Sequence, residues 1–165
     1  MVAAAEAEDF EFDVSEWFNS APLTPTDLRG KVVLVEFFQM LCPGCVNHAI
    51  PQAQKVHRTV QGDALQVLGI HSVFEHHQAM TPEALKVFLS EFRVDFPVAV
   101  DRPRQGLPVP ATMRRWNLQG TPTTMLVDRD GKVRQTLFGQ LDELVLGVWL
   151  GTLLAGSGGA RPEGA

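Results

Sequence analysis

An apolar run that ends shortly before a pair of cysteines constrains this chain more than any other feature. Residues 32–38 are apolar at every position except Glu36, and three of them are valines. A continuous run of this length is typical of a strand that is covered on both faces, as in α/β proteins with parallel strands. The segment 46–60 that follows has helical character, with Pro51 expected to kink it. The sequence therefore predicts a buried strand, a turn that carries two thiols, and a helix.

Both cysteines of the 165-residue chain lie in that turn, in the order Cys42-Pro43-Gly44-Cys45. Two thiols at this spacing can close a small disulfide ring and reopen it, and a helix N-terminus favours the reactive thiolate. Two cysteines are too few for the disulfide framework of a small secreted protein. The motif therefore predicts thiol–disulfide chemistry.

The rest of the chain alternates between predicted strands and helices, which indicates an α/β fold with a central mixed sheet and helices on both faces. We expect one domain over residues 13–154, between a flexible N-terminus (1–12) and a disordered, Gly/Ser/Pro-rich tail (155–165). The remaining strands are predicted over 64–73, 97–100, 121–127 and 132–138, with a hairpin turn at 128–131. The remaining helices are predicted after a Thr81 cap, over 111–117, and from an Asp142 cap to about residue 154.

Charge and hydropathy exclude several kinds of partner. The net charge is −5 and no run is rich in Lys or Arg, which argues against nucleic acid and anionic membranes. The longest apolar segment, 141–154, is too short and too interrupted by glycine for a membrane helix. No basic region precedes an apolar run near the N-terminus, so we expect a cytoplasmic protein, or a periplasmic one if the chain is a processed mature form.

Several segments together resemble the thioredoxin-like superfamily and, within it, the TlpA/ResA-like branch, which is related to the redoxins and AhpC/TSA proteins. The resemblance covers residues 20–150 and is carried by 28–38, the Cys-Pro-Gly-Cys motif, 96–101 and 120–132. A CxxC motif alone is a weak indicator. Its combination with an apolar strand and with a later Gly-Thr-Pro-Thr segment is specific. The resemblance implies a thioredoxin-like fold and a thiol–disulfide oxidoreductase that acts on protein disulfides.

The same resemblance implies roles for three residues. Cys42 would be the exposed nucleophile, and Cys45 the partly buried resolving thiol. Glu36, six residues before Cys42, would be a buried acid that assists proton transfer at Cys45. A carboxylate in an apolar strand is costly unless it is paired or protonated, and a raised pKa would suit a proton relay. The alternative is that Glu36 points to solvent at the end of the sheet.

The resemblance also implies a substrate-binding surface at the motif. Pro122 would be a cis-proline that faces the disulfide, and Thr121 would offer backbone groups to an extended substrate segment, beside Pro43 and Gly44. It implies no metal and no cofactor other than the redox-active Cys42–Cys45 disulfide. The expected partners are protein thiols or disulfides and a further redox protein, and we expect a monomer.

Four features depart from the family pattern. The dipeptide between the cysteines is Pro-Gly instead of Gly-Pro, and Leu41 stands where an aromatic residue is usual. Pro51 falls one residue later than the family spacing, and His48 replaces a glutamate that many TlpA-like proteins carry. Known CxxC potentials span about −270 to −120 mV, so these changes leave the direction of electron transfer open.

Three other functions remain open. The first is a peroxiredoxin-like peroxidase in which Cys42 becomes a sulfenic acid and Cys45 resolves it, although Gln39 stands where peroxiredoxins carry Thr or Ser. The second is a non-enzymatic scaffold that binds partners at the Pro122 groove. The third is a zinc site that adds histidines to the CxxC pair. The histidines available for it are His71, His76 and His77, which we otherwise expect in a solvated loop.

Overall fold

A six-stranded mixed sheet forms the centre of the structure, a computed structural model that describes residues 7–60 and 62–156. The strand order is β1-β4-β3-β2-β5-β6, with parallel pairing between β2 and β3 and between β3 and β4, and antiparallel pairing elsewhere. The strands are β1 (Val14–Phe18), β2 (Val32–Phe38), β3 (Leu65–His71), β4 (Val98–Asp101), β5 (Thr123–Val127) and β6 (Val133–Phe138).

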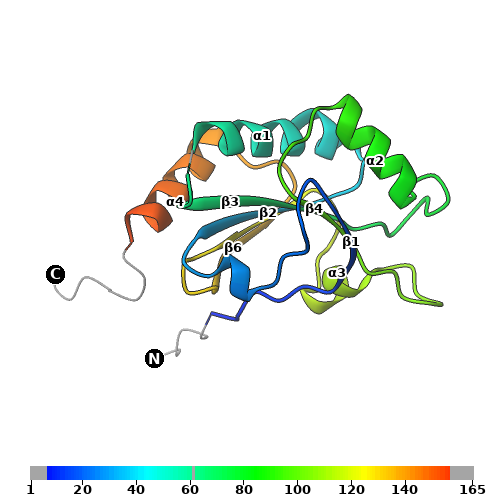
Figure 1. Cartoon of the computed structure of the whole chain (residues 1–165), viewed down its shortest axis with the longest axis horizontal. Coiled ribbons are helices and arrows are strands. Elements are labelled where there is room, and N and C mark those ends of the chain that lie inside the picture. Colours follow the sequence, from blue (N-terminus) through cyan, green and yellow to red (C-terminus); the bar gives the residue numbers. More distant parts are fainter. Residues whose placement is uncertain (1–6, 61, 157–165) are drawn as a thin grey trace.

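Helices cover both faces of this sheet, which confirms the predicted α/β architecture (Figure 1). Three of them, α1, α2 and α4, lie on one face, and the short α3 lies on the other. The helical elements are η1 (a 3₁₀ turn, Thr26–Leu28), η2 (a π-helical turn, Cys45–Ala49), α1 (Ile50–Thr59), α2 (Pro82–Glu91), α3 (Ala111–Arg115) and α4 (Glu143–Ala155).

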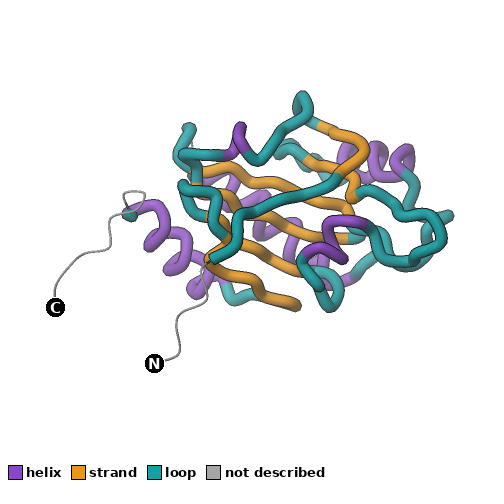
Figure 2. Tube along the Cα trace, turned by 90° about the horizontal axis from the view of Figure 1, so that it is seen from below, coloured by secondary structure: helices purple, strands orange, loops and turns teal. Residues whose placement is uncertain are grey.

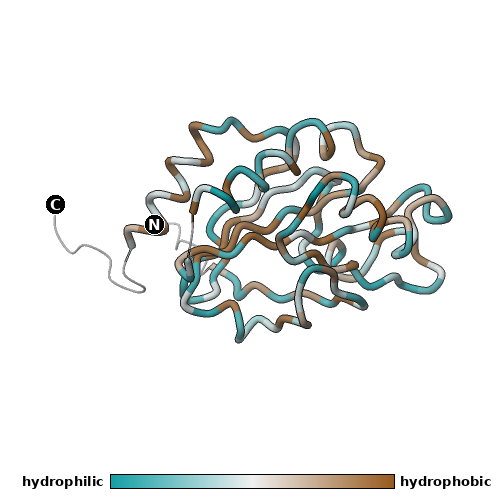
Figure 3. The backbone as a smooth tube through the Cα atoms, turned by 45° about the horizontal axis from the view of Figure 1, so that its top comes forward, coloured by the Kyte–Doolittle hydropathy of each residue, from teal (hydrophilic) through white to brown (hydrophobic). Residues whose placement is uncertain are grey.

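The central strand β2 supplies both halves of the core, because alternate side chains of a strand point to opposite faces. Leu34 and Phe38 pack under α1, α2 and α4, whereas Val33, Val35 and Phe37 pack on the opposite face. Figure 2 shows that loops, more than helices, cross this opposite face. Hydrophobic residues follow the central strands in Figure 3, as the continuous apolar run of β2 predicts.

The segment 7–12 is packed against the domain, which differs from the predicted flexible N-terminus. Phe10 is buried, and its N–H donates to the carbonyl of Gly131 at 2.8 Å. The Phe10 ring also stacks on Trp116, with 6.1 Å between ring centroids. Phe10 therefore helps to close the face that α3 leaves open. Residues 1–6 and 157–165, which include half of the predicted flexible N-terminus and most of the predicted tail, lie outside the described residues, so the domain limits stay predictions.

Strand β1 is an element that the sequence analysis does not predict. It pairs antiparallel with β4 at the edge of the sheet, where Trp17 lies opposite Ala99. Its middle residues, Ser15 and Glu16, are exposed. An edge strand with one polar, solvated side has no continuous apolar run, so its hydrophobic pattern does not predict a strand.

The predicted helix starts and the hairpin are confirmed. The Thr81 hydroxyl accepts the Ala84 N–H at 3.2 Å at the start of α2. The Asp128 carboxylate holds the β5–β6 turn by accepting the Lys132 N–H at 3.0 Å. All three tryptophans are half-buried. Among the residues that the structure describes, no helix combines the length and apolar character that crossing a membrane requires.

Candidate functional site

The turn before the cysteines is fixed by the strand that neighbours β2. In the parallel register, Phe38 at the end of β2 lies opposite His71 at the end of β3. Nε2 of His71 accepts the backbone N–H of Met40 at 3.1 Å. The N–H of Cys42 then donates to the carbonyl of Gln39 at 3.0 Å. These two bonds turn the chain out of the sheet and place Cys42 at the start of a helical segment.

Cys42 occupies the position of a helix N-cap. Its carbonyl accepts the Val46 N–H at 3.0 Å, and its Sγ accepts the Cys45 N–H at 3.3 Å. In this reduced state the Cys42 thiol also donates to the Thr121 carbonyl at 3.5 Å. The side chain is partly exposed, so the sulfur is accessible and also faces a helix N-terminus, where the free N–H groups favour negative charge.

Cys45 is the buried member of the pair, with an exposed fraction of 0 %. Burial in the core under α1 raises the pKa of the Cys45 thiol well above its usual range, and the neighbouring Cys42 adds to the increase. Hydrogen bonds from the Gln39 backbone and the Thr121 side chain oppose it. The Cys45 thiol therefore needs a base before it can act as a nucleophile.

Glu36 is buried with 2 % exposure, so the alternative in which it points to solvent is wrong. On β2, Glu36 lies two residues from both Leu34 and Phe38, so the three side chains point to the same face of the sheet. Leu34 and Phe38 belong to the core cluster that contains Cys45. The Thr124 hydroxyl donates to Glu36 Oε2 at 2.9 Å, and Oε1 has no partner. Burial raises the pKa of this carboxyl to about 8, so the protonated acid prevails at neutral pH.

The Thr121–Pro122 peptide bond is cis, as expected from the sequence. Pro122 is buried and packs on the motif itself: a Cβ atom added to Gly44 would lie 3.3 Å from Pro122 Cδ. A glycine between the cysteines therefore permits this close approach. Pro43 is exposed and Thr121 half-buried. The part that these four residues play in substrate binding stays a prediction.

The helix after the motif is less regular than predicted. A π-helical turn, η2, precedes α1, and the Ile50 N–H accordingly bonds to the carbonyl of Cys45, five residues earlier. Pro51 follows directly and has no N–H to give. A wider turn accommodates a proline ring near the start of a helix, and π turns are frequent at functional sites. The helix thus begins with a widened turn beside the cysteines, and the kink expected at Pro51 stays a prediction.

Gln39, which stands where peroxiredoxins carry Thr or Ser, lies at the site although the sequence did not predict it there. It is buried with 1 % exposure, and its Oε1 accepts the Phe74 N–H at 3.2 Å. Its Nε2 lies 3.5 Å from both Glu75 Oε1 and Thr121 Oγ1, at the outer limit of a hydrogen bond. The sequence feature that could have identified Gln39 is its position as a polar residue directly after an apolar strand.

The three histidines do not gather into a site. His71 is buried, not solvated as expected, and desolvation lowers the pKa of its imidazole to about 4. His76 and His77 are exposed, as predicted, and the His77 ring lies 2.9 Å from the Pro108 carbonyl. Across segments 7–60 and 62–156, no group of three or more His, Cys, Asp or Glu residues is placed to hold a metal ion.

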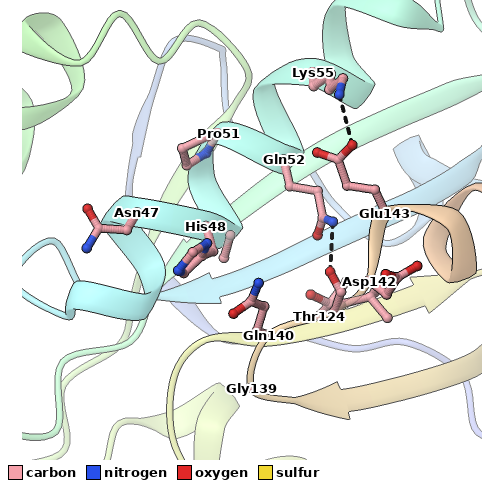
Figure 4. Close-up of a pocket in the computed structure, with 12 residues that line it drawn as sticks. Asn47, His48, Pro51, Gln52, Lys55, Thr124, Gly139, Gln140, Asp142 and Glu143 are labelled. Carbon is pink, nitrogen blue, oxygen red and sulfur yellow. Dashed lines mark hydrogen bonds and ion pairs between the residues drawn. The ribbon is translucent and has the colours of Figure 1, made fainter.

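A cavity of about 560 Å³ lies between the start of α1 and the loop that leads into α4 (Figure 4). Gln52 closes one side by donating to the Leu141 carbonyl at 2.9 Å, and Lys55 pairs with Glu143 at 2.9 Å. Thr124, the partner of Glu36, forms part of the wall. His48, one of the four departures from the family pattern, is exposed and lines this cavity.

A thiol pair at the junction of β2 and a helix, facing a cis-proline before β5, defines a protein with the thioredoxin-like fold. A sequence model of the AhpC/TSA family matches residues 3–136. The chain therefore belongs to the AhpC/TSA family.

Similar proteins include a thiol-disulfide isomerase of known structure and a curated thiol-disulfide oxidoreductase. A thiol-disulfide isomerase from Corynebacterium glutamicum is 58 % identical, with a TM-score of 0.91 over 93 % of this chain and 100 % of that one. DipZ of Mycobacterium bovis is 28 % identical over 132 residues, and ResA of Geobacillus thermodenitrificans, a thiol-disulfide oxidoreductase, 25 % over 117. These alignments cover 78 % and 70 % of this chain, but it spans only 18 % of DipZ and 59 % of ResA.

Proposed function

We propose that this protein is a thiol–disulfide oxidoreductase that exchanges electrons with protein disulfides through Cys42 and Cys45. One observation carries the proposal: the accessible Cys42 sulfur, at a helix N-terminus, accepts a hydrogen bond at 3.3 Å from the backbone N–H of the buried Cys45. The similarity to a thiol-disulfide isomerase along the whole length of that chain supports it.

The reaction proceeds in two exchanges. The Cys42 thiolate attacks one sulfur of a substrate disulfide, so that a Cys42–substrate bond forms, the substrate S–S bond breaks, and the leaving thiolate takes up a proton. The Cys45 thiolate then attacks Cys42 Sγ, which releases the second substrate thiol and forms the Cys42–Cys45 disulfide. Two electrons and two protons pass from the protein to the substrate. A dithiol redox partner restores the reduced form, and the reverse sequence oxidises a substrate dithiol.

Glu36 serves the second exchange. Burial holds the proton on Cys45, and the thiolate is the form that attacks. An ionised Glu36, on the same side of the sheet, accepts that proton and returns it as the acid, and its pKa of about 8 suits both directions near neutral pH. The Thr124 hydroxyl orients the carboxyl from the opposite strand.

The substrate segment lies in an extended form across the motif. Thr121 offers backbone groups beside the Cys42 sulfur, and Pro122, Pro43 and Gly44 form the surface below it. The protein acts on protein thiols or disulfides as a monomer with no other cofactor.

A trapping experiment tests the proposal. Cys45→Ser stops the reaction after the first exchange, because no thiol remains to release the substrate, so the variant is expected to accumulate mixed disulfides. These are read by non-reducing electrophoresis and mass spectrometry of the Cys42 peptide. Cys42→Ser is the matched control and should trap nothing, and reduction of insulin disulfides should require both cysteines. Absence of any adduct with Cys45→Ser would refute the proposal.

A peroxidase of the peroxiredoxin type is the second candidate, favoured by membership of the AhpC/TSA family. In that reaction Cys42 is oxidised to a sulfenic acid by a hydroperoxide, which is reduced to the alcohol or water, and Cys45 condenses with it to form a disulfide and water. Gln39 stands where peroxiredoxins carry Thr or Ser, which counts against this candidate. Rapid catalytic consumption of peroxide, dependent on Cys42, would favour this candidate over the first.

A further inference from the structure

A cavity of about 290 Å³ opens directly beside Cys42 and shares no lining residue with the cavity of Figure 4. Cys42, Pro43 and Thr121 form part of its wall, and the remaining wall comes from the turn before the motif and from the loop between β3 and α2. The other lining residues are Gln39, Leu41, Phe74, Glu75, His76 and Met80.

The wall of this cavity combines apolar surface with a negative charge. Met80 is buried and Phe74 half-buried, and Leu41 adds apolar surface at the mouth. Glu75 supplies the sole carboxylate among the lining residues, which include neither Lys nor Arg. A side chain with a long aliphatic stem and a cationic end matches both properties, because the stem can pack on the apolar wall while the charged end pairs with the carboxylate.

Gln39 positions the loop that carries this carboxylate. Its buried side chain accepts the Phe74 N–H and so ties the β3–α2 loop to the end of β2. Its Nε2 reaches Glu75 and Thr121 only at 3.5 Å each, which leaves this buried donor with two weak partners on the cavity side. A substrate carbonyl beside the cationic side chain can provide the stronger acceptor that Nε2 lacks.

We propose that this cavity is a specificity subsite that takes an arginine or lysine side chain next to the reactive cysteine of the substrate, with Glu75 as the recognising carboxylate. The inference rests on the proposed function and adds a substrate class: cysteines in basic sequence contexts. The occupant must come from within one or two residues of the substrate cysteine. Cys42 is itself part of the wall, and successive residues of an extended chain are about 3.4 Å apart.

Peptide disulfides of defined sequence test this subsite. Homodimers joined by one disulfide carry Arg, Gln or Glu on both sides of the cysteine, and a further dimer carries the same arginines four residues away. The last peptide separates local recognition from steering by the protein's net charge of −5. Initial rates of Cys42 modification in Cys45→Ser are measured at pH 8. We expect the adjacent-Arg peptide to react about fivefold faster than its Gln and remote-Arg counterparts.

Variants of the loop identify the carboxylate. In the Cys45→Ser background, Glu75→Gln should abolish the preference for adjacent Arg, and Glu75→Arg should reverse it in favour of the adjacent-Glu peptide. Glu83→Gln, on the exposed first turn of α2, removes the same charge outside the cavity and should retain the preference. Raising the salt concentration to about 0.5 M should reduce the preference, because the pair is solvent-accessible.

The possible failures are distinguishable. Equal rates for all peptides, or a preference that survives Glu75→Arg, would refute the subsite and leave the oxidoreductase proposal intact. A preference shared by the remote-Arg peptide would assign it to net charge and also refute the subsite. If Cys42 forms no adduct with any peptide, the proposed function fails, and the subsite fails with it.

Discussion

Glu36 and Cys45 are two buried acids, and desolvation raises the pKa of each. Neither is held in its charged form by a neighbouring cation. Glu36 keeps one hydrogen bond, from Thr124, and an unpartnered oxygen. Such a carboxyl lowers stability whenever it ionises, so its retention in the centre of β2 is better explained by chemistry than by stability.

The pH dependence of stability tests the buried state of Glu36. The folded protein holds this proton up to about pH 8, whereas the unfolded chain releases it near 4.5. The contribution to stability is therefore fully present below about pH 4.5 and is lost as the pH rises to about 8, by on the order of 5 kcal/mol. Glu36→Gln cannot ionise, so the variant should lack this part of the decline.

Urea unfolding of the reduced protein at pH 5 and pH 8 measures the effect. Glu16→Gln, on the exposed part of β1, is the matched control and should follow the wild-type decline. A Glu36→Gln profile parallel to that of the wild type would show that the carboxyl is not buried as described.

At the scale of the element, hydrogen bonds at helix starts decide where helices begin. The starts of α2 and α4 are predicted correctly because Thr81 and Asp142 carry side chains that accept N–H groups of the first turn. The π-helical turn η2 is not predicted, because it depends on how the segment after Cys45 accommodates Pro51. Local side-chain chemistry thus fixes the helix starts, while the irregular turn next to the site depends on packing.

The cap of α4 provides a prediction at this scale. The Asp142 carboxylate accepts the N–H groups of Leu144 at 2.8 Å and Val145 at 3.1 Å. Asp142→Ala should lower the free energy of unfolding by about 1 kcal/mol, whereas Asp142→Asn, which retains an acceptor, should lose less. Thermal and urea unfolding measure both variants. Equal losses for the two substitutions would attribute the effect to charge rather than to the cap.

At the scale of the whole molecule, one sheet separates two hydrophobic clusters, and β2 and β5 contribute to both. Trp149 packs against the cluster under α1, α2 and α4, and Trp116 packs against the opposite one. Because neither cluster can persist without the shared strands, the two faces are expected to unfold together.

Single-tryptophan variants test this cooperativity. One variant keeps Trp149 and the other keeps Trp116, with phenylalanine at the remaining two positions. We expect fluorescence and circular dichroism to give the same urea midpoint within each variant, although the two midpoints can differ from the wild type. A fluorescence transition that precedes the loss of secondary structure in either variant would show that its face unfolds independently.

The alternation of strands and helices, the thiol pair, the helix caps and the hairpin can be predicted from the sequence, because each depends on residues close together in the chain. Folding then brought distant segments into contact. It buried Phe10 and His71, added β1 to the sheet edge, packed Pro122 on Gly44, and brought Gln39 and Glu75 to the cavity beside Cys42. Burial and long-range contacts set pKa values and shape cavities, and no pattern within one segment encodes them.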